Sequence, residues 1–101
     1  MEKAIIKIET SISAAEFKEE LSKGLKDYNA SLKSGDRRIS EEDIKVATSP
    51  GFTGAEIALF VGAAISSGIT YDVCKYVVVA HVLPRIRNRF GSDAADLKED
   101  D

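Results

Sequence analysis

The stretch Thr53–Phe90, TGAEIALFVGAAISSGITYDVCKYVVVAHVLPRIRNRF, decides the fold. Fifteen residues without a charge separate Glu56 from Asp72, and beyond Lys75 the chain stays apolar as far as Leu83. A chain of 101 residues has room for one modest core, so this stretch must supply most of the buried surface. The rest of the chain is expected to be arranged around it.

Cap signals divide this stretch into two helices. Thr53 followed by Glu56 has the T-x-x-E pattern of a capping box, which starts a helix. Gly68 can take the left-handed conformation that ends it, and Thr70 can cap the next helix. The sequence thus predicts an apolar helical hairpin.

The segment Cys74–Leu83 leaves an alternative open, because its run Val77–Val79 is typical of a buried strand. We favour a helix because the Thr70 cap precedes it. Apolar residues also keep helical spacing, at Val73, Val77, Ala80 and Leu83. Pro84 would then kink the helix and free the carbonyl of Ala80.

Two strands are predicted in the first half of the chain. Lys3–Glu9 alternates between apolar and charged residues, with Ile5 as the exception, and Asp43–Thr48 alternates again before Pro50. A helix lies between them, so the strands could be parallel neighbours with a right-handed crossover. Two strands are a poor sheet alone, so the hairpin must cover them, a third strand must be found, or a second copy must extend the sheet.

The helix between the two strands has the clearest start signal in the chain. Ser13 and Glu16 form a capping box, and Ile12 can pack onto Phe17. Its apolar face is Ala14, Phe17, Leu21, Leu25, Tyr28 and Leu32. Gly24 lies on the apolar side and predicts a close approach to the sheet. The fold class is therefore α+β, a βαβ-like front (two strands, one amphipathic helix) packed with a C-terminal apolar helical hairpin.

Charge and cysteine content exclude some functions. The formal net charge of −3 gives no general attraction to nucleic acid or anionic lipid, so nucleic-acid binding is not expected. One cysteine excludes an internal disulfide, which fits the cytoplasm. Residues 1–91 are expected to form a single domain. Residues 92–101 are expected to be an acidic, disordered tail that could also fold back onto a basic patch of Arg85, Arg87 and Arg89.

Small residues recur every four positions in the first predicted helix of the hairpin. They are Gly54, Ala58, Gly62 and Ser66, and the larger Ile57, Val61 and Ile65 lie beside them. Such a stripe lets another backbone come close, either within the chain or from a second copy. Because the front half offers little area to cover the hairpin, we expect a homodimer or a higher homo-oligomer with this stripe as its interface. The identity of any other protein partner is left open.

No group of residues forms a recognised catalytic, metal or cofactor signature. Cys74 and His81 are seven positions apart, about 10 Å along a helix, which is too far to share a proton. The loop SPGFTG precedes a predicted helix but lacks the lysine of a phosphate-binding loop. We therefore expect a non-enzymatic interaction module without cofactors. The alternative from another class is a small enzyme that uses Cys74 or His81.

A membrane contact is a further alternative. A spanning helix needs about 20 apolar residues, and only 15 lie between Glu56 and Asp72. A peripheral contact, with Arg85, Arg87 and Arg89 at the lipid headgroups, stays open.

The segment PGFTGAEIALFVGAAISSGITYDVCKYVV followed by RIRNR resembles small bacterial conflict-system modules known as effector-associated components. The likeness covers about a third of the chain and is one of composition. It implies a non-enzymatic adaptor or associated component in a bacterial defence or toxin system.

Overall fold

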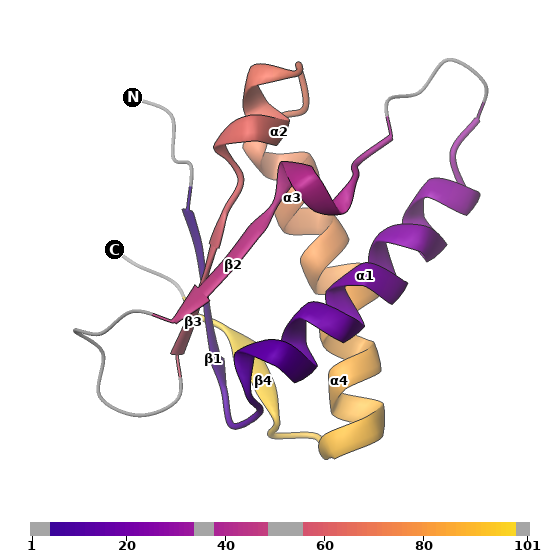
Figure 1. The fold of residues 1–101 in the computed structure, drawn as a ribbon. Coiled ribbons are helices and arrows are strands. Elements are labelled where there is room, and N and C mark those ends of the chain that lie inside the picture. The colour runs from indigo at the N-terminus through magenta and orange to yellow at the C-terminus, as the bar shows by residue number, and fades with distance from the viewer. Residues whose placement is uncertain (1–4, 34–37, 49–55, 99–101) are drawn as a thin grey trace.

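The chain folds into a sheet with its helices packed on one side. The structure, a computed structural model, describes residues 5–33, 38–48 and 56–98. Figure 1 shows α1 and the C-terminal helical segments on the same side of the strands. This arrangement confirms the α+β class. In chain order the elements are β1 (Ile5–Thr10), α1 (Ala14–Ala30), η1 (Glu41–Asp43), β2 (Lys45–Thr48), β3 (Glu56–Phe60), α2 (Gly62–Ser66), α3 (Tyr71–Val77), η2 (Val78–Val82), α4 (Leu83–Phe90) and β4 (Ala95–Leu97).

The four strands lie in the order β2-β3-β1-β4, and every neighbouring pair is antiparallel. β1 and β2 run in the same direction, as a βαβ unit requires, but β3 lies between them. The expectation that they are neighbours was therefore wrong. Strand order and connectivity correspond to the ferredoxin-like, split βαβ arrangement.

The first helix of the predicted hairpin is the largest correction. Residues Glu56–Phe60 form β3, and only Gly62–Ser66 is helical before the chain turns. β3 is hydrogen-bonded to a strand on each side, and its residues Ile57–Phe60 form a continuous apolar run, whose period does not separate strand from helix. The proposed cap Thr53 lies outside the described residues.

The second helix of the hairpin is confirmed, and the strand alternative for Cys74–Leu83 was wrong. The Thr70 side chain accepts a hydrogen bond from the backbone N–H of Val73 (3.2 Å), and Gly68 has φ +101°. From there α3, the π-helical turn η2 and α4 follow without a break as one C-terminal helix. Pro84, which supplies no N–H to the helix, is the second residue of α4 and lies two positions after the last residue of the π turn.

The described part of the acidic tail is ordered, which corrects the expectation for residues 92–98. Ala95–Leu97 forms β4 and pairs with β1. The Thr10 hydroxyl is buried and donates to the carbonyl of Ala94 (2.7 Å), and the N–H of Ser11 donates to the same oxygen (3.0 Å). Residues 94–98 are thus part of the domain.

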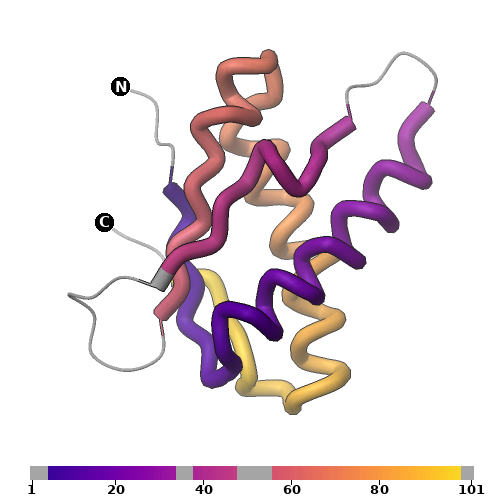
Figure 2. Tube along the Cα trace, in the orientation of Figure 1, coloured from indigo at the N-terminus to yellow at the C-terminus, as the bar shows by residue number. Residues whose placement is uncertain are grey.

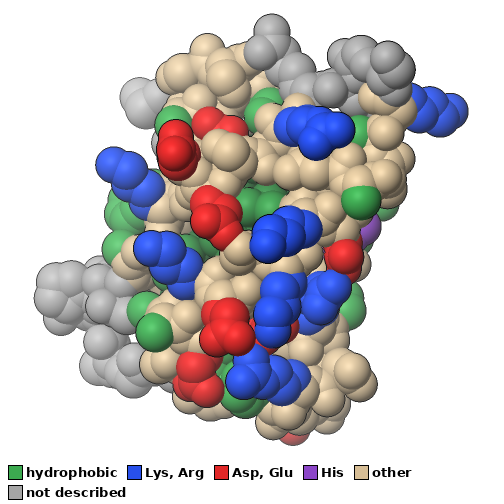
Figure 3. Space-filling view, turned by 45° about the vertical axis from the view of Figure 1, so that its right-hand side comes forward, with side chains coloured by type: hydrophobic (Ala, Val, Ile, Leu, Met, Phe, Trp, Pro, Cys, Tyr) green, Lys and Arg blue, Asp and Glu red, His purple; other side chains and the backbone are tan. Residues whose placement is uncertain are grey.

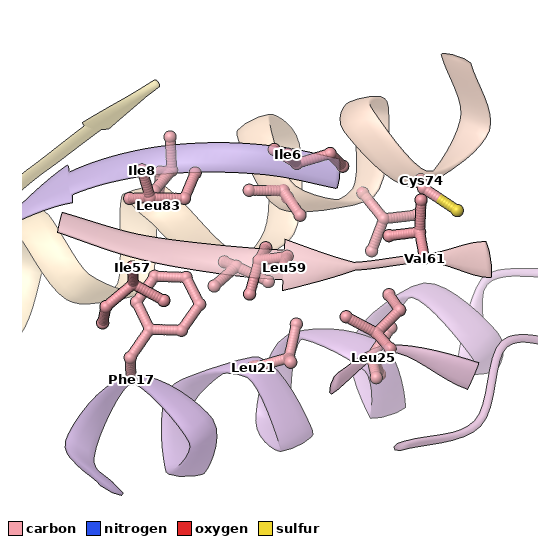
Figure 4. Close-up of a cluster of buried hydrophobic side chains, with 14 of the residues drawn as sticks. Ile6, Ile8, Phe17, Leu21, Leu25, Ile57, Leu59, Val61, Cys74 and Leu83 are labelled. Carbon is pink, nitrogen blue, oxygen red and sulfur yellow. The ribbon is translucent and has the colours of Figure 1, made fainter. Parts of the chain in front are cut away.

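The core lies between the sheet and the helices. In Figure 4 the side chains of α1 point at β3, with the ring of Phe17 against Ile57, and Leu83 lies beside Ile8. Both hydrogen bonds of the Ser13–Glu16 capping box are present, as predicted.

Gly24 had been expected to face the sheet, and this expectation was wrong. It faces the C-terminal helix, which crosses α1 in Figure 2. A Cβ at this position would lie 2.8 Å from the carbonyl oxygen of His81 and 2.7 Å from a methyl of Val82. Glycine is therefore required for the contact between the two helices.

Candidate functional site

The three arginines of the predicted basic patch are engaged within the protein. Arg85 Nε donates to Asp27 of α1 (3.1 Å). Arg87 donates through Nε to the carbonyl of Ala95 (3.0 Å) and through Nη2 to Asp96 (3.1 Å). The tail thus folds back onto Arg87 as had been anticipated.

Arg89 reaches the only buried carboxylate among the described residues. Its Nη1 lies 2.6 Å from Oε2 of Glu20, a side chain only 3% exposed. This hydrogen bond, followed by the charges of nearby carboxylates, raises the pKa of Arg89. Figure 3 shows basic and acidic side chains interspersed over this side of the molecule. The arginines hold the C-terminal helix to α1 and β4, and they do not form an unopposed positive surface.

Cys74 and His81 lie in different surroundings. Cys74 is fully buried beside Val61 (Figure 4), and burial, followed by the charge of Asp43, raises the pKa of its thiol. His81 is partly exposed, with its ring 5.7 Å from that of Tyr28 and 6.0 Å from that of Tyr76, measured between centroids. Within the described ranges no group of three His, Cys, Asp or Glu could hold a metal ion.

Burial of Cys74 predicts an unreactive thiol. The thiolate is the nucleophile, so a raised pKa and lack of exposure both slow its reaction. We expect a coloured disulfide reagent at neutral pH to leave native Cys74 unmodified and to label it stoichiometrically in denaturant. Rapid labelling of the folded chain would contradict this and would restore Cys74 as a candidate nucleophile.

The predicted small-residue stripe does not exist as one surface. Ala58 is in β3, whereas Gly62 and Ser66 are in α2, and Gly54 lies outside the described residues. The larger residues expected beside it are partly in the core. Ile57 and Val61 are buried, and Ile65 is half-buried.

The side of the sheet turned away from the helices carries an exposed apolar surface, which had not been predicted from the sequence. We call it the outer face. Ile5 of β1 and Phe60 of β3 are directly paired there and are each 41% exposed. None of the described helices lies over them (Figure 1). The only sequence signal was that Ile5 interrupts the alternation of its strand.

Charges on the outer face are separated along the strands. Glu9 is directly opposite Glu56 on one side and Asp96 on the other, so three carboxylates form a row at one end. Lys45 lies beside Phe60 at the opposite end. By strand register and alternation the face comprises Ile5, Lys7, Glu9, Lys45, Ala47, Glu56, Ala58, Phe60, Asp96 and Lys98.

A depression of about 890 Å³ opens at the acidic end of the outer face. Four of its charged groups form two ion pairs, since Arg87 binds Asp96 and Lys98 binds Glu56. The Thr10 hydroxyl is also occupied, by the Ala94 carbonyl. None of the side chains that line this depression is a histidine or cysteine, and the arrangement has no nucleophile beside a base.

Comparison with known proteins gives no relative. No family model matches the chain, and no curated protein or solved structure matches it. The resemblance to conflict-system components therefore stays a prediction. Over the ranges that the structure describes, no helix has both the length and the apolar character needed to cross a membrane.

Proposed function

We propose that the chain is a non-enzymatic protein-interaction module whose binding surface is the outer face of the sheet. The observation that carries this proposal is the exposed pair of Ile5 and Phe60. Two large apolar side chains held side by side on rigid strands, with lysines and carboxylates around them, have the composition of an interface centre with a polar rim.

The surroundings of the other candidate residues support this choice. The buried Cys74 and the separate His81 favour a structural role for both. Recognition of RNA by a four-stranded sheet relies on several aromatic residues that together stack two or three bases, and the described outer face has one aromatic residue, Phe60. A peripheral membrane contact would require the arginines to leave Asp27, Glu20 and Asp96.

The biological setting that we propose is the cytoplasm of a bacterium, as an adaptor in a defence or toxin system. This part follows from the resemblance of the segment from Pro50 to Val78 to effector-associated components. The predicted hairpin no longer supplies the interface, and the outer face takes its place in the proposal.

The test compares two immobilised variants as baits. Ile5→Thr/Phe60→Thr removes the apolar pair but keeps β-branched residues in the strands. Lys18→Ala/Lys26→Ala changes two exposed positions of α1 and serves as the matched control. The prey is an extract of the native host together with a tagged copy of the chain itself.

We expect the wild type and the control to retain at least one protein, and the outer-face variant to bind it at least about tenfold more weakly. Buried apolar anchors at an interface centre are each worth about 1–2 kcal/mol or more. If the outer-face variant retains the same proteins equally well, the outer face is not the binding surface.

A further inference from the structure

The described residues leave four large apolar side chains exposed, and these fall into two pairs. Ile5 and Phe60 lie on the outer face, each 41% exposed. Tyr76 and Val79 lie on the C-terminal helix and are 59% and 42% exposed. The first pair lies on two hydrogen-bonded strands, and the second lies on α3 and the π-helical turn η2 of the C-terminal helix.

The second pair points away from the sheet. Cys74, Val77 and Val78 of the same helix are fully buried. Successive helical residues are turned by roughly 100°, which places Tyr76 and Val79 on the opposite side from these three. Ala80 and Pro84 are also exposed there, so an uncharged surface runs from Tyr76 to Pro84. We call it the outer helix surface.

The outer face and the outer helix surface each lack the kind of partner that the other could supply. This sheet has helices on one side only, so its outer face is open to a helix from another molecule (Figures 1 and 2). The outer helix surface is an apolar helical face with no sheet against it. Since it points away from its own sheet, it cannot reach its own outer face, but it can reach that of another copy.

Charge complementarity gives the orientation. The exposed acid Asp72 lies one helical turn before Tyr76, at the start of the outer helix surface. The outer face has Lys45 beside Phe60 at one end and the carboxylates of Glu9 and Glu56 at the other. A helix laid along the strands can therefore place Asp72 near Lys45 and keep it away from the carboxylates at the other end.

We propose that the outer face binds the outer helix surface of a second copy. This inference rests on the proposed function and names its partner. Such contacts are heterologous, because each copy uses two different surfaces, so they continue into rings or open chains. A two-fold contact of sheet on sheet about an axis along the strands between β1 and β3 is disfavoured, since it would stack Glu56 of one copy on Glu9 of the other.

A mixing experiment tests the proposal. The sheet variant is Ile5→Thr/Phe60→Thr, and the helix variant is Tyr76→Ser/Val79→Ser, which keeps similar helix propensity. Circular dichroism first establishes that both are folded. Light scattering is then measured from about 10 μM to about 1 mM, the range in which modest interfaces dissociate.

We expect the mass of the wild type to rise with concentration beyond that of a dimer, whereas each variant alone stays monomeric. Mixed together, the variants should form a 1:1 complex of twice the monomer mass and stop there, because only one intact pair of surfaces remains. Adding Lys45→Glu to the helix variant should weaken the mixed complex. Adding Asp72→Lys to the sheet variant should then restore it.

Every other outcome overturns the inference in an identifiable way. Dimers of the helix variant alone would mean sheet-on-sheet pairing, and dimers of the sheet variant alone would mean helix-on-helix pairing. A wild type that stays monomeric at about 1 mM would exclude assembly with a dissociation constant at or below about that concentration. The proposed function would still stand if a monomeric wild type retains a different host protein through Phe60, and it would fail together with the inference if nothing depends on Phe60.

Discussion

Replacing Phe17 by alanine is expected to lower the free energy of unfolding by about 3–5 kcal/mol, the usual cost of truncating a buried phenylalanine. Its side chain is fully buried and its ring lies between α1 and β3, against Ile57 (Figure 4). Both surrounding elements are regular and cannot collapse into the space. A domain of this length is stable by roughly 5–15 kcal/mol, so the variant loses a large part of its margin. Urea unfolding followed by circular dichroism measures the difference.

Tyr76→Ala is the matched control, because it truncates another aromatic ring but one that is 59% exposed. We expect its free energy of unfolding to stay within about 0.5 kcal/mol of the wild type, as is usual for surface positions. Equal losses for the two variants would mean that Phe17 is not at the centre of the core. The control also shows whether substitutions on the outer helix surface leave the fold intact.

Local signals were sufficient wherever a few neighbouring residues determine the structure. The capping box of Ser13 and Glu16 is formed by groups three positions apart, so its pattern is visible in the sequence. Gly68 and Thr70 likewise predicted the turn and the start of the C-terminal helix correctly. These features need no knowledge of the rest of the chain.

β3 could not be predicted in this way because its structure depends on distant partners. Its hydrogen bonds go to β1 and β2, and its run Ile57–Leu59 is buried throughout. With Ala58 and Phe60 on its outer face, β3 also lacks the alternation of apolar and polar residues that indicates a half-buried strand. Small residues at four-residue spacing then suggested a helix, and the predicted interface of Gly54, Ala58, Gly62 and Ser66 followed from that error.

The candidate site was hidden for the same reason. Phe60 becomes part of an exposed pair only because the strand register places it opposite Ile5. The arginines resembled a basic patch because their partners are far away in the sequence. Asp27 is 58 positions from Arg85, and Glu20 is 69 positions from Arg89.

Gly24 is the position where an added methyl group should be most damaging for its size. In an isolated helix, alanine in place of glycine would stabilise by about 1 kcal/mol. Here the new Cβ would lie 2.8 Å from the carbonyl oxygen of His81, an atom of the backbone that no side-chain rotation can move. His81 belongs to the π-helical turn Val78–Val82, so α1 and the C-terminal helix would have to move apart where they cross.

We therefore expect Gly24→Ala to lower the free energy of unfolding by about 1–3 kcal/mol, the usual range for overpacking a well-packed core, in spite of its better helix propensity. Urea unfolding measures the change, with Lys26→Ala as the control at an exposed position of the same helix. The control should be neutral within about 0.5 kcal/mol. The outcome that would contradict this is a Gly24→Ala variant as stable as the wild type, or more stable. It would show that the two helices do not pack closely at Gly24, and that the C-terminal helix is not held against α1 in this way.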